Sequence, residues 1–128
     1  MKFGHTIIYV KDVIETVDFY EKAFGLKRQF IDPQGVYAQM ETGGVALGFA
    51  CEKLAKSNIK IDFNKNTPTA MPSGFEISFV VDDVKKSLEK AIKAGCSKVS
   101  DPEHKPWGQE VAYVRDLNGV LVELSTEM

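Results

Sequence analysis

The chain has 128 residues, of which 44% are hydrophobic and 27% charged, a composition typical of one globular domain. Its formal net charge of −2 argues against nucleic acid or an anionic membrane as the main partner, and no apolar run approaches the roughly 20 residues of a membrane span. The N-terminus lacks the apolar region of a signal peptide and the two cysteines lack metal-binding spacing, which indicates a cytoplasmic protein with reduced thiols.

The first part of the chain predicts a strand, a helix and three further strands. Residues 6–10 are mostly β-branched and aromatic, which is typical of a strand. Apolar residues then recur at roughly helical spacing between Asp12, a suitable N-cap, and Gly25, a stop signal. The three expected strands that follow, of which the last two form a hairpin, are residues 26–31, 36–40 and 45–50.

The last part of the chain predicts the same order of elements. Residues 75–81 form the expected strand, and a helix follows between Asp83 and Gly95. Residues 101–108 are polar and contain two prolines, which predicts a loop. The three expected strands of this part, of which the last two form a hairpin across an Asn-Gly turn, are residues 97–100, 109–115 and 120–125.

The segment between these parts, residues 51–73, contains Lys, Asn, Thr, Pro and Ser and predicts a linker in which Leu54 and residues 59–63 can form a short ordered piece. Two βαβββ modules place the chain in the α+β class. The expected organisation is one domain, residues 1–128, made of module one (1–50), the linker (51–73) and module two (74–128).

The two modules also repeat in sequence, and the repeat selects candidate functional residues. Aligning the Asp-Val pairs that open the two helices places His5 over Glu76. A second repeat, between residues 44–49 and 119–124, pairs Gly48 with Glu123. Two copies are too few for a solenoid, so they predict two similar modules packed in one domain.

Three motifs carry a resemblance to a known superfamily: Asp18-Phe19-Tyr20 followed by Phe24-Gly25-Leu26, the Pro106-Trp107-Gly108 loop, and residues 116–124. With the two βαβββ modules, they make the chain similar to the vicinal oxygen chelate superfamily, which includes glyoxalase I, bleomycin-resistance proteins, fosfomycin-resistance enzymes and extradiol dioxygenases. The resemblance implies that each module curls its strands into a half-open cup and that paired modules enclose a ligand cavity.

The resemblance also implies metal-ligand positions on the first and last strands of each module, here His5, Gly48, Glu76 and Glu123. Glyoxalase I activity is not expected, because Gly48 has no side chain and Glu76 stands where a histidine is common. His5, Glu76 and Glu123 would suit a hard divalent ion such as Mn²⁺, Fe²⁺ or Mg²⁺, with Ni²⁺ or Zn²⁺ as further candidates. The alternative is that no metal binds and that His5 hydrogen-bonds one of the carboxylates. Glu123 is also a candidate catalytic general base.

Aromatic side chains provide candidate substrate-binding walls, with core packing as the alternative for each: Tyr37, Phe49, Phe75 and Trp107. Trp107 is the strongest of them, because Pro106 and Gly108 flank it in a polar loop. Arg28 and Arg115 could bind an anionic substrate or be charges on the surface of a strand.

Two functions remain open from the sequence, and a third possibility is a module whose cavity is vestigial. The first is a small-molecule metalloenzyme, a metal-dependent lyase, isomerase or dioxygenase, acting through His5, Glu76 and Glu123. The second is a bleomycin-resistance-type protein that binds a planar or cationic drug without catalysis. In both cases the partner is a small molecule, and the resemblance implies a homodimer that buries otherwise exposed strand edges.

Overall fold

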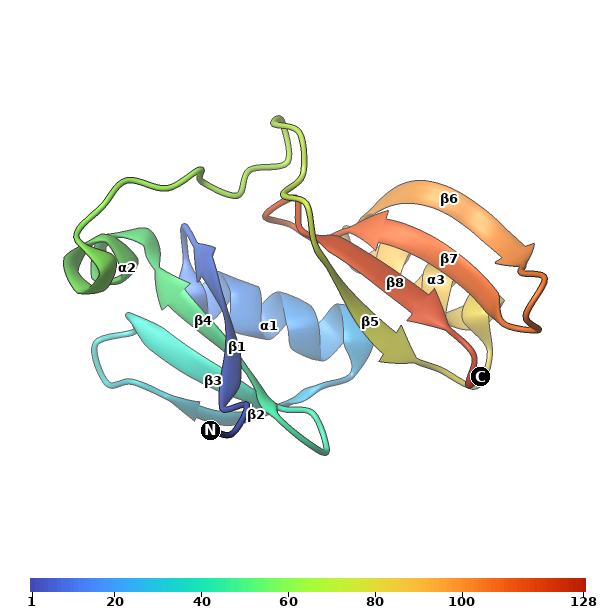
Figure 1. Ribbon diagram of the computed structural model, residues 1–128, viewed down its shortest axis with the longest axis horizontal. Helices are drawn as coiled ribbons and strands as arrows, with labels where there is room; N and C mark the ends of the chain where they lie inside the picture. The colour runs from blue at the N-terminus through green and yellow to red at the C-terminus, as the bar shows by residue number, and fades with distance from the viewer. The chain divides into compact units, whose positions relative to one another are not determined.

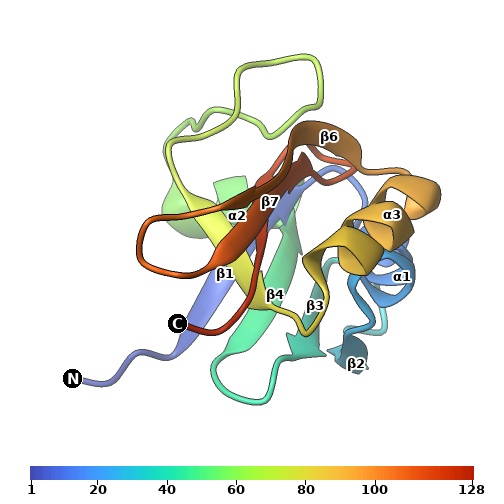
Figure 2. The ribbon, with the colours of Figure 1, turned by 90° about the vertical axis from the view of Figure 1, so that its right-hand side faces the viewer.

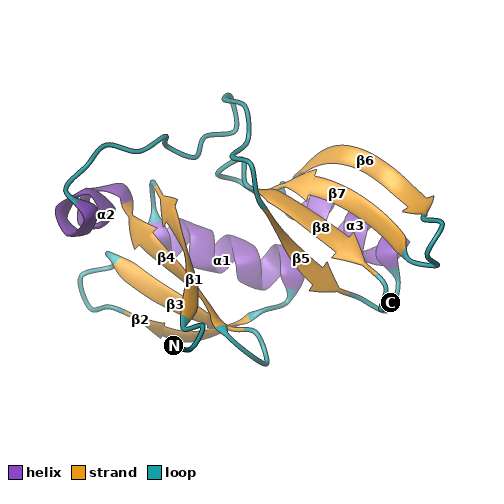
Figure 3. Ribbon diagram, in the orientation of Figure 1, coloured by secondary structure: helices purple, strands orange, loops and turns teal.

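The computed structural model describes residues 1–128 and divides into two compact units, Met1–Asn66 and Thr67–Met128. Each unit contains a four-stranded mixed sheet with a long helix packed on one face (Figures 1 and 3). The predicted α+β class with two βαβββ modules is therefore confirmed.

The first unit has the strand order β1-β4-β3-β2, in which β1 runs parallel to β4 and the other neighbours are antiparallel. Helix α1 contacts β2, β3 and β4. The elements are β1 His5–Val10, α1 Val13–Phe24, β2 Lys27–Ile31, β3 Tyr37–Glu41, β4 Ala46–Cys51 and a short helix, α2 Glu52–Ile59.

Helix α1 begins and ends where the sequence predicts. The side chain of Asp12 accepts a 2.9 Å hydrogen bond from the backbone N–H of Glu15, which satisfies one of the free donors of the first turn. Gly25 ends the helix in the left-handed conformation that glycine adopts without steric cost. The buried face of α1 includes Val17 and Tyr20, and these side chains form the core between the helix and the sheet.

The second unit repeats this arrangement with the strand order β5-β8-β7-β6, in which β5 runs parallel to β8. Figure 2 shows α3 on one side of strands β6 and β7. Asp83 caps the start of α3, and Gly95 ends it in the left-handed conformation. The elements are β5 Glu76–Val80, α3 Val84–Ala94, β6 Ser97–His104, β7 Glu110–Arg115 and β8 Leu121–Ser125.

The structure places a helix, α2, in the segment that the sequence predicts as linker. Its N-cap is Cys51, whose Sγ accepts from the backbone N–H of Leu54 at 3.4 Å. Cysteine is not a preferred N-cap residue, and Ala55 is the one fully buried side chain of the helix. A short helix with little apolar surface and no standard cap gives a weak sequence signal, and this explains the difference.

Strand β6 is also longer than expected, because residues 101–104 continue the strand that the sequence ends at Ser100. Pro102 predicts a break, since proline cannot donate to a strand ladder. Here β6 is an edge strand, and its pairing with β7 is irregular between Ser100 and Glu103. At a sheet edge one backbone N–H of each pair of residues faces away from the neighbouring strand, so the missing N–H of Pro102 does not end β6.

Candidate functional site

The pairing of the first and last strand within each unit supports the alignment drawn from the sequence repeat. In the first unit Gly48 lies opposite Ile7, and in the second unit Glu123 lies opposite Ser78. His5 and Glu76 begin the corresponding strands β1 and β5 in the same register. Gly48 and Glu123 therefore hold equivalent positions in their own sheets, as do His5 and Glu76.

The carboxylate of Glu123 is held by hydrogen bonds from both neighbouring strands. Ser78 Oγ on β5 donates to Oε1 of Glu123 at 2.6 Å, and the Tyr113 hydroxyl on β7 donates to Oε2 at 2.8 Å. The neighbours of Glu123 along β8, Val122 and Leu124, are buried in the core. Because side chains alternate along a strand, Glu123 occupies the sheet face opposite to theirs.

Glu76 lies at the exposed start of β5 and interacts electrostatically with Glu123. Partial burial raises the pKa of Glu76, and the negative charge of Glu123 raises this pKa further, while the neighbouring Tyr113 hydroxyl opposes the shift. We call Glu76 and Glu123 the carboxylate pair. Like charges that lie close together favour the protonated form of one partner, so the pair attracts protons and cations.

Tyr113 links the two members of the carboxylate pair. The hydrogen bond to Glu123 raises the pKa of Tyr113 to about 12, with further contributions from burial and from the charges of Glu123 and Glu76. The phenol therefore stays protonated and donating at neutral pH. The second unit thus presents two carboxylates and two hydroxyls together on one sheet face, through Glu76, Ser78, Tyr113 and Glu123.

The equivalent position in the first unit is filled by a tyrosine instead of a carboxylate. A Cβ atom added to Gly48 would lie 2.6 Å from the hydroxyl oxygen of Tyr37 and 3.3 Å from Cγ1 of Ile7. This hydroxyl accepts a 2.9 Å hydrogen bond from Nε2 of Gln39, and the ring lies 6.0 Å from that of Phe30. The first unit therefore offers aromatic and amide groups where the second offers carboxylates.

The remaining predicted site residues differ in exposure. His5 is exposed at the start of β1, Phe75 is 45% exposed just before β5, and Trp107 is 63% exposed in the loop after β6. The Trp107 indole N–H donates to Oε1 of Gln109 at 2.7 Å, which orients the ring.

Phe49 differs from the other aromatic candidates because it is fully buried. Its ring packs against Tyr20 of α1 at 4.8 Å, on the opposite sheet face from Gly48. Phe49 is therefore part of the core of the first unit, which is the alternative that the sequence left open for each aromatic residue.

The two arginines that the sequence left as possible anion ligands both have partners within their own unit. Arg28 pairs with Asp18 at 2.9 Å and with Glu21, two carboxylates of α1. Arg115 donates to the backbone carbonyls of Gly119, Thr67, Pro68 and Ala70. Both arginines therefore have a structural role: Arg28 binds side chains of α1, and Arg115 binds backbone carbonyls near the start of the second unit and in the β7–β8 turn.

Sequence reasoning missed Ser78 and Tyr113. Ser78 follows Glu76 by two residues, so strand alternation places both on one face. Tyr113 lies directly opposite Glu123 in the β7–β8 hairpin, a pairing that follows from the hairpin register. Strand alternation and hairpin register were the signals that could have identified them.

Neither unit alone contains three or more His, Cys, Asp or Glu side chains grouped so that they could hold a metal ion. The carboxylate pair nevertheless offers donor atoms that suit a hard divalent cation, because such ions prefer carboxylate oxygens as ligands. Each oxygen of Glu123 already accepts one protein hydrogen bond and keeps further acceptor capacity. Of the three predicted metal ligands, Glu76 and Glu123 lie in the second unit and His5 lies in the first.

The fold of the two βαβββ modules agrees with a comparison against protein families. A model of the Glyoxalase/Bleomycin resistance protein/Dioxygenase superfamily matches residues 2–124. The chain belongs to this superfamily. No curated protein matches the chain at a significant level.

Solved structures share the fold at low sequence identity. A glyoxalase-related enzyme from Fulvimarina pelagi has a TM-score of 0.83 at 17% identity, covering 99% of this chain and 88% of that one. A glyoxalase/bleomycin resistance protein/dioxygenase family enzyme from Burkholderia phytofirmans PsJN has a TM-score of 0.77 at 19% identity, covering 98% of both chains. A hypothetical protein from S. aureus, SA1046, has a TM-score of 0.81 at 22% identity, covering 99% of this chain and 94% of that one. At these identities the likeness concerns the fold alone.

None of the helices in the structure has the length and apolar character needed to cross a membrane.

Proposed function

We propose that the protein is a small-molecule-binding member of the superfamily, in which the carboxylate pair receives the cationic part of the ligand. The observation that carries this proposal is that Glu76 and Glu123 lie on one sheet face, where partial burial and the charge of Glu123 raise the pKa of Glu76. A cation bound between the two carboxylates would offset this repulsion.

The hydrogen bonds around Glu123 prepare this site for a ligand. Ser78 and Tyr113 fix the carboxylate orientation before any ligand arrives, which lowers the ordering cost of binding. Val80, 61% exposed, follows Glu76 and Ser78 in the alternation of β5 and adds apolar surface to the same face. A ligand with a cationic group and an apolar body fits this combination. Phe75 and Trp107 stay predicted contacts of that body.

A metal-dependent enzyme is the second candidate, and the matching strand registers of the two units favour it. The registers match between the two units, which supports the repeat alignment from which the ligand positions His5, Glu76 and Glu123 are predicted. A bound divalent ion would polarise a substrate oxygen or lower the pKa of a bound water. In this candidate His5 would supply an imidazole nitrogen. Tyr113 and Ser78 would orient Glu123, which would either ligate the ion or accept a proton.

The two candidates differ in their dependence on His5, and calorimetric titration separates them. The wild type and the variants His5→Ala, Glu76→Gln and Glu123→Gln are titrated with metal-free bleomycin and, separately, with MnCl₂. Glu89→Gln, an exposed carboxylate of α3 in the same unit as the pair, is the matched control.

Drug binding that both glutamine variants weaken and His5→Ala leaves unchanged supports the binding protein. Mn²⁺ binding that His5→Ala abolishes supports the metalloenzyme. Binding of neither probe to the wild type, or an equal loss in Glu89→Gln, contradicts both candidates.

We also propose that the protein is a homodimer in solution. Both sheets have edge strands, β1 and β2 in the first unit and β5 and β6 in the second, and unpaired edges favour association. Light scattering at micromolar concentration should give twice the mass of the chain, whereas a monomeric mass would contradict the proposal.

A further inference from the structure

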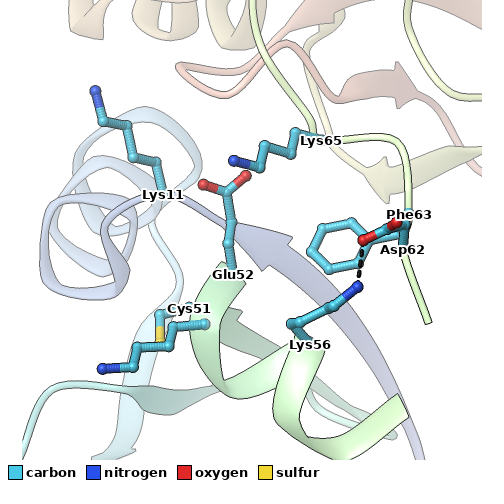
Figure 4. Close-up of a pocket in the computed structure, with 8 residues that line it drawn as sticks. Lys11, Cys51, Glu52, Lys56, Asp62, Phe63 and Lys65 are labelled. Atoms are coloured by element: carbon cyan, nitrogen blue, oxygen red, sulfur yellow. Dashed lines mark hydrogen bonds and ion pairs between the residues drawn. The ribbon is translucent and has the colours of Figure 1, made fainter. Parts of the chain in front are cut away.

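We propose a second ligand site, specific for a small organic anion, in a cavity of the first unit that is separate from the carboxylate pair. The cavity measures about 610 Å³, within the range of small-molecule sites. It lies beside the start of α2 (Figure 4). We call it the lysine cavity, and the residues that line it are Lys11, Cys51, Glu52, Lys53, Lys56, Asp62, Phe63 and Lys65.

Positive charge dominates the lining, with four lysines against two carboxylates. Lys56 forms an ion pair with Asp62, and Lys65 points toward the carboxylate of Glu52 (Figure 4). Lys11 and Lys53 form no ion pair within the chain. These two exposed ammonium groups therefore remain available to an external partner, and an anion complements their charge.

The lining also provides apolar surface for the body of a ligand. Phe63 is half-buried, and its ring packs edge-on against that of Tyr9 at 4.9 Å, which fixes its orientation. The lysine side chains contribute apolar methylene stems beneath their charged ends. An anion with a flat apolar body fits these walls better than a compact inorganic ion, which would leave most of the cavity unfilled.

The wall that carries Phe63 is held in place from both ends. At its start, Lys60 closes α2 in the left-handed conformation, and its backbone N–H donates to the carbonyl of Lys56. At its end, Nδ2 of Asn66 donates to the backbone carbonyl of Tyr9 on β1 at 3.0 Å. The backbone of this wall is therefore anchored, which lowers the cost of ordering it around a ligand.

The test compares two probes of the same shape and opposite charge. Naphthalene-2-sulfonate and naphthalen-2-ylmethylammonium are titrated separately into the ¹⁵N-labelled full chain, and backbone amide shifts are followed. The sulfonate should shift the amides of residues 51–56 and 62–65 saturably, and the ammonium compound should leave them unchanged. Raising the salt concentration should weaken sulfonate binding, since the lysines are exposed.

Charge-removing variants make the assignment specific. Lys11→Gln and Lys53→Gln should each weaken sulfonate binding about two- to fivefold, the range expected for an exposed charge pair. Lys27→Gln, on β2 outside the cavity, removes the same charge from the same unit and should leave the affinity unchanged.

Equal shifts with both probes, absence of shifts around α2, or equal weakening by Lys27→Gln would each overturn the proposal. None of these outcomes bears on the carboxylate pair, which lies in the other unit.

Discussion

The hydroxyl of Tyr113 donates a 2.8 Å hydrogen bond to Oε2 of Glu123 across the neighbouring strands β7 and β8. The same hydroxyl also interacts with Glu76, so one phenol influences the protonation of both carboxylates. This arrangement makes the protonation of Tyr113 and Glu76 sensitive to the charge of Glu123. The first two predictions follow from this coupling.

Replacing Glu123 by Gln should lower the pKa of Tyr113 from about 12 toward its ordinary value of 10, because the largest cause of the shift is the hydrogen bond to Glu123. The ¹³Cζ resonance of Tyr113, assigned with Tyr113→Phe, reports this titration. The folded state keeps the phenol proton to higher pH than the unfolded state does. The stability that it contributes is therefore present below pH 10 and lost between pH 10 and about 12. An unchanged Tyr113 pKa in Glu123→Gln would contradict the coupling.

Replacing Glu76 by Gln should stabilise the protein at neutral pH and leave it unchanged in acid. The raised pKa of Glu76 means that its stabilising contribution is complete below the ordinary value of 4.5 and is lost as pH rises through the higher folded-state pKa. The gain at pH 7 should stay below about 1 kcal/mol, since Glu76 is exposed to solvent. Urea unfolding of wild type and variant at several pH values measures it. Glu89→Gln, which removes an exposed carboxylate of α3, is the control, and a destabilised Glu76→Gln at pH 7 would refute the prediction.

Replacing Gly48 by Ala should destabilise the protein by about 1 kcal/mol, because the cost of overpacking is partly offset by the gain from replacing a glycine within a strand. The new Cβ would lie 2.6 Å from the hydroxyl oxygen of Tyr37, so the ring must move. Combining the change with Tyr37→Phe removes that oxygen and should recover part of the loss. Gly44→Ala, where a new Cβ meets no atom within 4 Å, is the control. Equal unfolding free energies for Gly48→Ala and the wild type would show that Tyr37 does not fill this position.

Replacing Arg115 by Lys should cost about 1–2 kcal/mol, because lysine cannot reproduce the forked donors of a guanidinium. The side chain of Arg115 donates to Ala70 O at 2.7 Å and to Gly119 O at 2.8 Å, and it also donates to the carbonyls of Thr67 and Pro68. Hydrogen exchange at Ala70, whose N–H donates to Thr67 O, should accelerate.

Arg28→Lys is the matched control for this change, since Arg28 pairs with exposed or half-exposed carboxylates of α1. Its cost should stay below about 1 kcal/mol, as expected for surface ion pairs. Equal costs for the two substitutions would argue against a special role for the backbone contacts of Arg115.

The sequence predicts the long elements well because several local signals agree at each of them. Helices α1 and α3 combine helical spacing of apolar residues with an aspartate N-cap and a glycine stop, at Asp12 and Gly25 and again at Asp83 and Gly95. Helix α2 escapes prediction because its cap is Cys51 and its apolar face is small. The extension of β6 past Pro102 depends on its edge position, which only the strand order reveals.

The candidate site was predicted in part for a comparable reason. The internal repeat compares positions within the chain, so it identifies Glu76 and Glu123 without any knowledge of the strand order. The contribution of Tyr113 depends on which strands are neighbours and on their register, which are properties of the folded sheet. The burial of Phe49 against Tyr20 likewise depends on which sheet face the helix covers.

The most direct test of the proposed function is the side-chain carboxyl ¹³Cδ shifts of Glu76 and Glu123 during a titration with metal-free bleomycin. We expect both resonances to shift saturably and together, and we expect the pKa of Glu76 to fall in the complex, since a bound cation favours the ionised carboxylate. If the drug binds while both carboxyl resonances stay unchanged, or if it does not bind at all, the carboxylate pair is not the site of a cationic drug of this type.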